Sequence, residues 1–409
     1  MARKWLFVLV ALLAMLAVNG LPALAQDEFV FGIVLVGPKN DRGWSQAHYE
    51  AGLKIEEEMP GSKMLLFESL NPADNPQTTL LDVATEMAGQ GAKVIFTTSD
   101  EFEEDTDTVA AALPDVVFIN STGSSALEGK APANVGNTNA QYEWTRAISG
   151  CAAALATQTG SIGYLGPLIN FETRRHAAAT YLGAKYCYEN YRGMASSDLK
   201  FTVTWIGFWF NIPGVTLDPT AEANAFFDGG SDVVISGIDT TEALVVAGQR
   251  HAEGEAVFAM SQDNPAGCDE ATDVCIGGPY YNWFPAYSSI VTAVKDGAWT
   301  QSWDWVAPNW DDINDAETSS TSFIVGGALT DEQKTQLDSF IAEMAAYAKD
   351  PANADSFFLW QGPLNLQDGS VLVPEGESVT PVTKLADGVS IWYLPQLLEG
   401  MTGASTSSN

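Results

Sequence analysis

Polar and aromatic side chains follow the predicted strands of this chain. The first apolar run, residues 29–38, is followed by Asn40, Asp41 and Trp44. The remaining candidates occupy equivalent places after later runs: Phe102, Phe171, Trp209, Asp239, Asp263, Asn282 and Trp283. In open parallel sheets, ligands bind outside the carboxyl ends of the strands. We therefore expect these ten side chains to surround a binding site.

The residue types at these positions indicate the chemistry of a ligand. Aromatic faces stack on flat rings, Asp accepts hydrogen bonds from ring N–H groups or sugar hydroxyls, and Asn both donates and accepts. A phosphate group would need Arg, Lys or a glycine-rich helix entry, and these are missing here. The set predicts a neutral heterocycle, bare or carrying a sugar.

Each candidate also has a purely structural interpretation. Asp41 precedes a predicted helix and could cap it. Trp44 could belong to the core, and His48, one helical turn later, could pack beside it. Asp239 and Asp263 end strands, where turn and cap roles are common. The binding hypothesis rests on the repetition of an aromatic residue with Asp or Asn at successive strand ends.

The elements that would position these residues alternate regularly. A first block has strands at 29–38, 63–69, 92–99 and 115–121, with helices at 41–59, 76–89 and 106–113. A second block has strands at 161–167, 201–210, 232–238 and 256–263, with helices at 141–157, 172–190, 218–227 and 241–251. Alternating strands and helices predict parallel sheets in an α/β fold. A further helix is expected at 330–349.

Length and charge limit the possible partners. The chain has 409 residues, which suggests two lobes and not a single core. Its formal net charge of −33 is dispersed along the sequence, so nucleic acid and anionic membrane surfaces should repel it. The excess of acid is also typical of a solubility adaptation or of a salty habitat.

The first 25 residues have the layout of a cleavable signal peptide. Arg3 and Lys4 precede an apolar stretch, and Ala23-Leu24-Ala25 forms a small-residue exit. The alternative is an uncleaved membrane anchor, but the apolar stretch is short for a span of roughly 20 residues. No Cys follows this stretch, so we expect an exported protein, periplasmic or extracellular, without a lipid anchor.

The four cysteines allow two disulfides in an exported chain. Cys268 and Cys275 bracket a six-residue loop and suit a local staple, whereas Cys151 and Cys187 could bridge two neighbouring helices. The sequence alone does not fix the pairing. A zinc site is not expected, because the cysteine spacing is wrong and the three histidines are scattered.

The sequence lacks the motifs that are typical of secreted hydrolases. It contains neither a G-x-S-x-G nor an H-E-x-x-H motif, and only three histidines. We therefore predict a binding protein without catalysis, metal or cofactor. A secreted hydrolase and a sensor that feeds a receptor are the alternatives.

Four segments carry a resemblance to a known family. GPKNDRGWSQAHYEAG at 37–52, VTWIGFWFNI at 203–212, GGPYYNWFPAYSSIVTAVKDGAW at 277–299 and QGPLNLQDGSVLVPEG at 361–376 contain its motifs. The chain resembles the basic membrane protein family of ABC-transporter substrate-binding proteins, and within it the purine-binding subgroup. Gly207, Phe208 and Asn211 depart from the usual Asn, Thr and Asp of that subgroup.

The resemblance implies a type I periplasmic-binding fold, with two Rossmann-like lobes around a hinge cleft. It implies lobes at 28–138 with 266–305, and at 139–265 with 306–409. It also implies a monomer that delivers its ligand to an ABC permease. Two aromatics, by position Trp44 and Trp209, would sandwich a purine base.

Polar contacts carry over from the family to Asp41, Asp239 and Asp263, with Asn40 as a further candidate. Nucleoside-binding members often have a Lys where this chain reads Tyr281-Asn282-Trp283. That departure favours a free base over a nucleoside. A sugar-binding protein of the same fold is the nearest alternative, because aromatics stack on sugars too.

Overall fold

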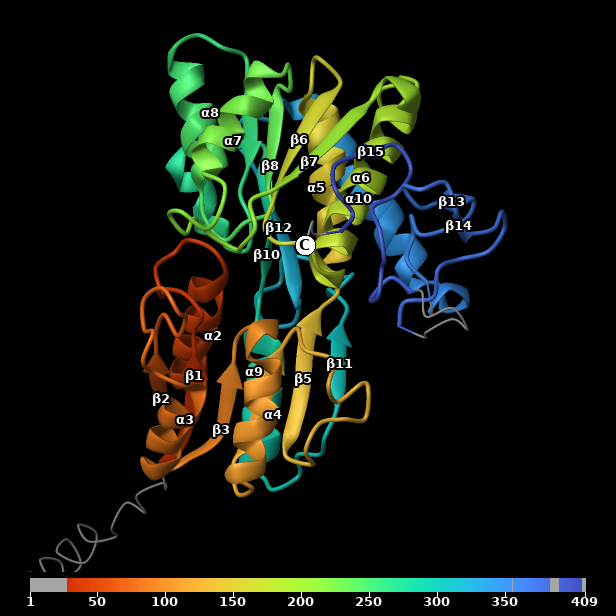
Figure 1. The fold of residues 1–409 in the computed structure, drawn as a ribbon. Helices are drawn as coiled ribbons and strands as arrows, with labels where there is room; N and C mark the ends of the chain where they lie inside the picture. Colours follow the sequence, from red (N-terminus) through yellow and green to blue (C-terminus); the bar gives the residue numbers. More distant parts are fainter. Residues whose placement is uncertain (1–27, 355, 383–389, 407–409) are drawn as a thin grey trace, which may run out of the picture.

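Two parallel β-sheets, stacked end to end, form the framework of the molecule (Figure 1). The structure is a computed structural model that describes residues 28–354, 356–382 and 390–406, so the predicted signal peptide lies outside the described residues. The lower sheet, called sheet A, has the order β11-β5-β4-β3-β1-β2, and all its paired strands are parallel. Its strands are β1 (Phe29–Val34), β2 (Ser62–Phe67), β3 (Ala92–Thr97), β4 (Val117–Ser121), β5 (Val135–Ala140) and β11 (Trp303–Val306).

The upper sheet, called sheet B, repeats this arrangement in the order β15-β7-β6-β8-β9, again with parallel pairs. Its strands are β6 (Ser161–Gly166), β7 (Lys200–Trp205), β8 (Val233–Ser236), β9 (Phe258–Met260) and β15 (Met401–Thr402). Between the sheets runs an antiparallel pair, β10 (Gly277–Tyr281) with β12 (Thr321–Val325). A short hairpin joins β13 (Leu364–Asn365) to β14 (Val371–Val373).

Helices cover both faces of each sheet, as the alternating pattern predicts. Sheet A packs against α2 (Trp44–Glu58) and α9 (Phe284–Lys295) on one face, and against α3 (Leu80–Gly89) and α4 (Glu103–Ala112) on the other. Sheet B packs against α5 (Glu143–Ala156), α6 (Phe171–Asn190) and α10 (Asp331–Lys349) on one face, and against α7 (Pro219–Asp228) and α8 (Glu242–Ala252) on the other. Short 3₁₀ turns occur at Asp100–Phe102, Ser196–Asp198, Pro265–Glu270 and Pro351–Asn353.

The first strand shows why apolar runs predict buried parallel strands. All six residues of β1 are buried. Phe31 and Ile33 point into the core under α2 and α9, whereas Val30 and Val34 point into the core under α3 and α4. A strand covered on both faces needs apolar residues at every position, so no alternation appears in its sequence. The predicted fold class is therefore confirmed.

Two differences from the predicted elements have physical reasons. The strand expected at 201–210 ends at Trp205, because Gly207 adopts φ 103° and turns the chain into a loop. Strand β5 was not predicted, because its sequence VGNTNA is polar although all six residues are buried. Asn137 compensates for its burial by accepting a hydrogen bond from the backbone N–H of Ala126.

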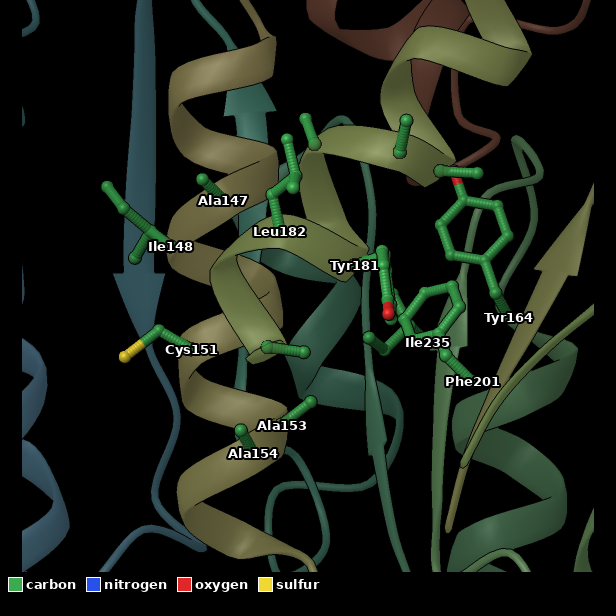
Figure 2. Packing of buried hydrophobic residues seen from close by; sticks show 14 of the residues in the cluster. Ala147, Ile148, Cys151, Ala153, Ala154, Tyr164, Tyr181, Leu182, Phe201 and Ile235 are labelled. Atoms are coloured by element: carbon green, nitrogen blue, oxygen red, sulfur yellow. The ribbon is translucent and has the colours of Figure 1, made fainter. Parts of the chain in front are cut away.

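Helices α5 and α6 cross at a very short distance, and their buried residues belong to one large hydrophobic core beside sheet B (Figure 2). A Cβ at Gly150 would lie 1.8 Å from the carbonyl oxygen of Thr180, and one at Gly183 would lie 1.9 Å from that of Ala147. Only glycines permit this approach. A disulfide between Cys151 and Cys187 joins the same two helices, and a second disulfide joins Cys268 to Cys275.

We predict that Gly183→Ala destabilises the protein. The added methyl group would overlap the Ala147 backbone, and overpacking of this kind costs about 1–3 kcal/mol of unfolding free energy. Urea denaturation monitored by circular dichroism measures the change. Gly89→Ala is the control, because no atom lies within 4 Å of a Cβ there. Equal stability of Gly183→Ala and wild type would contradict the close crossing.

Candidate functional site

A pocket lies where the carboxyl ends of the strands of both sheets meet. Its lining comes from the loops and helix starts that follow β1, β3, β4, β5, β6, β7, β8 and β9, and from β10. The lining residues are Val36, Trp44, Ser99, Asp100, Thr122, Tyr142, Glu172, His176, Trp209, Asp239, Gln262, Asp263 and Tyr281. In sheet A the strand order reverses at β1 and β3, and in sheet B at β6 and β8. The pocket therefore lies at two facing switch points, where such folds bind ligands.

Trp44 lines the pocket from the side of sheet A. As the first residue of α2 it follows the loop after β1. Its Nε1–H donates to the carbonyl oxygen of Thr98 at 2.6 Å. Its ring meets the rings of His48 and Tyr281 edge to face, with centroid distances of 4.6 and 5.1 Å. These contacts fix the orientation of the indole.

Trp209 lines the pocket from the side of sheet B. It lies in the loop between β7 and α7, which begins at the turn of Gly207. The carbonyl oxygen of Trp209 accepts a hydrogen bond from the N–H of Asp239 at 2.9 Å. The loop after β7 is thereby tied to the loop after β8. Two tryptophans far apart in sequence thus line one pocket.

Four acidic side chains, Asp100, Glu172, Asp239 and Asp263, line the same pocket. Burial raises the pKa of Asp239 well above its ordinary value, and the carboxylates of Asp263 and Asp41 raise it further. Among the described residues, none donates a hydrogen bond to the side chain of Asp239. The Asp239 carboxyl is therefore available to a donor inside the pocket.

Asp263 has a different environment. Its carboxylate accepts hydrogen bonds from Tyr142 Oη at 2.8 Å and from Gln262 Nε2 at 2.9 Å. Burial raises the pKa of Asp263 to about 6, and the buried Arg146 opposes this rise. The residue also adopts φ 63°, a left-handed conformation that is uncommon outside glycine and is found at functional sites.

A buried charge network lies at the start of α5 and α6. Arg175 Nε donates to Glu143 Oε1 at 2.6 Å, and Arg175 Nη2 lies 3.5 Å from Glu172 Oε1. Burial raises the pKa of Glu172 to about 8, with Arg175 acting in the opposite direction. Burial lowers the pKa of His176 well below its ordinary value, and both Arg175 and Arg146 lower it further. His176 is therefore neutral at pH 7.

Loops of the two sheets touch each other around the pocket. Asn170 Nδ2 donates to Asp100 Oδ2 at 3.0 Å, and Asn264 Nδ2 donates to Glu50 Oε2 at 3.2 Å. Gly43 approaches so closely that a Cβ there would lie 2.1 Å from the carbonyl oxygen of Asp239. The pocket is therefore enclosed by contacts between segments of sheet A and segments of sheet B.

Four of the ten candidates, Trp44, Trp209, Asp239 and Asp263, line this pocket. The oxygens of Asp41 accept hydrogen bonds from the backbone N–H groups of Gly43, Ser45 and Gln46 at the start of α2. That arrangement matches the capping alternative considered for Asp41.

The other five candidates lie outside the pocket lining. Asn40 is exposed, and Phe102 is buried in the core under α3 and α4. Phe171 is 47% exposed, and Asn282 donates to the carbonyl oxygens of Ala316 and Ser319. Trp283 packs behind the pocket, stacked on the His48 and Tyr281 rings.

Sequence reasoning missed most of the polar pocket lining. Glu172 and His176 lie within a helix of low hydrophobicity, so their sequence resembles a solvated face although they are buried. The buried Arg146 and Arg175 were missed for the same reason, since mid-helix arginines usually face water. Tyr142 was missed because it lies two residues after the end of strand β5, which the sequence did not predict.

Within the described ranges, no group of three or more His, Cys, Asp or Glu side chains has the arrangement of a metal site. The same ranges contain no helix whose length and apolarity would suit a membrane span.

Comparisons with known proteins agree with this architecture. The profile of a family described as ABC transporter substrate-binding protein PnrA-like matches residues 29–209. A protein of Brucella abortus named purine-binding protein is 26% identical over 371 residues, covering 88% of this chain and 91% of its own length. A Haloferax volcanii protein, whose name describes an ABC transporter glucose-binding protein, is 26% identical over 274 residues, covering 66% of this chain and 62% of its own.

Solved structures share the fold. An ABC-transporter solute-binding protein from Conexibacter woesei superposes with a TM-score of 0.58 at 18% identity, covering 78% of this chain and 96% of its own. The family match and the curated relatives support a solute-binding protein of ABC transporters, a class that acts outside the cytoplasm with a membrane permease. The predicted resemblance to the PnrA-like (Bmp) family of ABC-transporter substrate-binding proteins is confirmed by this family match and by the Brucella abortus relative.

We predict that Asp239→Asn raises the thermal stability of the ligand-free protein at pH 8. Because the folded-state pKa of Asp239 is raised, the folded state binds a proton more readily than the unfolded chain, and stability falls as pH rises from about 4. The amide of the Asn variant does not ionise, so the variant does not lose this stability as pH rises. Differential scanning calorimetry should show a Tm gain of at least about 2 °C at pH 8 that disappears near pH 4.

Asp232→Asn is the matched control. Asp232 is also buried, but its carboxylate accepts hydrogen bonds from Thr157, Gln158 and Thr159, so an amide should lower Tm at pH 8. A lower Tm for Asp239→Asn at pH 8 would show that the Asp239 carboxylate is stabilised within the protein.

Proposed function

We propose that the protein captures a purine base or nucleoside between Trp44 and Trp209 and presents it to a membrane permease for uptake. The observation that supports this proposal is the shared pocket, which two tryptophans from separate sheets line together with four acids. Stacking of a base on an aromatic side chain contributes about 1–3 kcal/mol per contact. Two stacking contacts would therefore supply much of the affinity.

The acidic lining restricts the chemistry of the guest. Asp100, Glu172, Asp239 and Asp263 favour ligand groups that donate hydrogen bonds, such as ring N–H, amino or hydroxyl groups. A phosphate would meet these acids without a cation in the pocket lining.

Binding would couple to closure of two lobes. We assign one lobe to 28–138 with 266–305 and the other to 139–265 with 306–409, as the family resemblance implies. A ligand that stacks on tryptophans from both lobes favours the closed arrangement, because only that arrangement provides both contacts. The proposal contains no catalytic step, and it places the mature protein outside the cytoplasm as a monomer without a lipid anchor.

We expect Trp44→Ala and Trp209→Ala each to weaken purine binding at least about tenfold, since each removes one stacking surface. Isothermal titration calorimetry with adenine, guanine and their nucleosides measures the loss. Trp310→Ala serves as the control, because Trp310 lies beside Trp144, away from this pocket. Unchanged affinity in both pocket variants would refute the assignment.

Gly43→Ala should weaken binding as well, by at least about tenfold. Its methyl group would overlap the Asp239 carbonyl oxygen in the closed arrangement, whereas separated lobes would leave it free. The Tm gain on adding ligand should therefore shrink. Thermal shift with and without purine measures this gain, and an undiminished gain would contradict the closure mechanism.

A sugar ligand is the second candidate, favoured by the name of the Haloferax volcanii relative and by the stacking of sugars on aromatics. A thermal-shift screen of purines, pyrimidines, nucleosides and glucose distinguishes the two. A sensor that feeds a receptor would bind the same ligand but would not support uptake in cells that contain the permease.

A further inference from the structure

Four stacked rings lie next to Trp44, and we call them the ring row. In order they are His48, Trp283, Tyr281 and Tyr142, and each ring is nearly parallel to the next. The centroid distances between neighbours are 4.3, 4.9 and 3.9 Å, with interplanar angles of 17°, 14° and 20°. Tyr281 and Tyr142 also line the pocket, whereas His48 and Trp283 lie outside its lining.

The ring row connects elements of both sheets. His48 belongs to α2, beside sheet A, and Tyr142 directly precedes α5, beside sheet B. Tyr281 ends β10, and Trp283 directly precedes α9. At the far end of the row, Tyr142 Oη donates to Asp263 Oδ1 at 2.8 Å. The row therefore reaches from the first helix of the chain to an acid in the pocket lining.

Trp44 stands almost perpendicular to this row. Its ring meets those of His48, Tyr281 and Trp283 at interplanar angles of 71°, 89° and 82°, with centroid distances of 4.6, 5.1 and 5.3 Å. The hydrogen bond from the indole N–H to Thr98 holds one atom of the ring and leaves its plane free to tilt about that bond. Edge-to-face contacts with three rings are favourable and restrict the tilt. The orientation of the indole face consequently depends on the ring row.

A buried chain of hydrogen bonds anchors the row at His48. His48 Nδ1 lies 2.6 Å from Tyr287 Oη, which in turn lies 3.1 Å from Ser121 Oγ. All three residues are fully buried, and they come from α2, α9 and β4. Among the described residues, Tyr287 is the only hydrogen-bond partner of the His48 ring, because no group reaches its Nε2. Loss of the Tyr287 hydroxyl would leave this buried ring without any partner.

We propose that His48 and Tyr287 are positioning residues, which hold Trp283 and Trp44 in the orientation that stacks on the ligand. The inference rests on the stacking role of Trp44 in the proposed function, and it adds residues that do not touch the ligand. Packing and hydrogen bonds behind a binding side chain keep that side chain in its productive geometry. Trp283, which lies outside the pocket lining, thereby acts on binding through Trp44.

The test is a double-mutant cycle with Tyr287→Phe, which removes the hydroxyl and keeps the ring that stacks on Phe96 at 3.8 Å. Purine affinity should fall at least about threefold, because the His48 ring loses its partner and shifts. In the Trp44→Ala background the same change should alter affinity less than about 1.5-fold, because the residue through which it acts is gone. Calorimetric titration of the mature protein and its three variants with adenine and adenosine measures these affinities.

Tyr347→Phe is the matched control. Tyr347 Oη also pairs with a serine, Ser356 Oγ at 2.7 Å, but it lies on α10. Both Phe variants lose a hydrogen bond and should have a lower Tm, whereas only Tyr287→Phe should lose affinity. Ser121→Ala interrupts the same buried chain at its other end, should show the same pattern in the cycle, and replaces Tyr287→Phe if that variant does not fold.

A second measurement needs no ligand. The indole N–H signal of Trp44 in a ¹H–¹⁵N correlation spectrum is identified by its absence in Trp44→Phe. It should move in Tyr287→Phe and stay in place in Tyr347→Phe, because only the first change disturbs the ring row.

The outcomes separate this inference from the proposed function. Unchanged affinity in Tyr287→Phe, an equal loss with and without Trp44, or an unmoved indole signal would each overturn the positioning role, even where Trp44→Ala and Trp209→Ala lose binding. If no purine compound binds wild type, the proposed function falls, and the indole signal alone then decides whether His48 and Tyr287 hold Trp44.

Discussion

The pocket depends on one geometric constraint: two parallel sheets direct the carboxyl ends of their strands at each other. In a parallel sheet, every strand ends at the same edge, so the loops that follow the strands collect there. Sheet A contributes Trp44 and Asp100, and sheet B contributes Trp209, Asp239 and the helix that carries Glu172. Each sheet thus provides half of an enclosure that neither could form alone.

The electrostatics of the enclosure are costly for the fold. Burial removes water that would hydrate the carboxylates of Asp239, Asp263 and Glu172 in the unfolded chain, and this raises the pKa of each group. Arg146 and Arg175 compensate in part, because their charges lower the pKa of Asp263 and of Glu172 respectively. Strained or destabilised groups that persist in a native structure are typical of functional sites. The buried acids that destabilise the fold therefore lie around the pocket and not in the cores beneath the sheets.

The sequence predicted the framework better than the site. Apolar runs such as residues 29–34 leave few alternatives to a buried parallel strand, and β1 to β4 and β6 to β9 were all anticipated. Strand β5 was not predicted because a buried strand rich in Asn has the composition of a loop. Its buried polar side chains find hydrogen-bond partners, such as the backbone N–H of Ala126 for Asn137, only in the folded protein. Of the site, Trp44, Trp209, Asp239 and Asp263 could be named because each follows a predicted strand. Glu172, His176 and Tyr281 required the tertiary arrangement, since nothing local distinguishes a helix face that borders a pocket from one that borders water.

Ligand binding and stability are linked through the same residues. The free protein contains an Asp239 side chain to which no described residue donates a hydrogen bond, and unpartnered atoms on His176 and Tyr281. A ligand that satisfies these groups binds only the folded protein, so it raises stability by RT ln(1 + [L]/Kd), which is about 2.7 kcal/mol at a ligand concentration of 100 Kd. The groups that destabilise the free fold are then the ones that make the bound state favourable. This reciprocity explains why a solute-binding protein can keep costly polar groups in its interior: the solute completes hydrogen bonds that the chain leaves open.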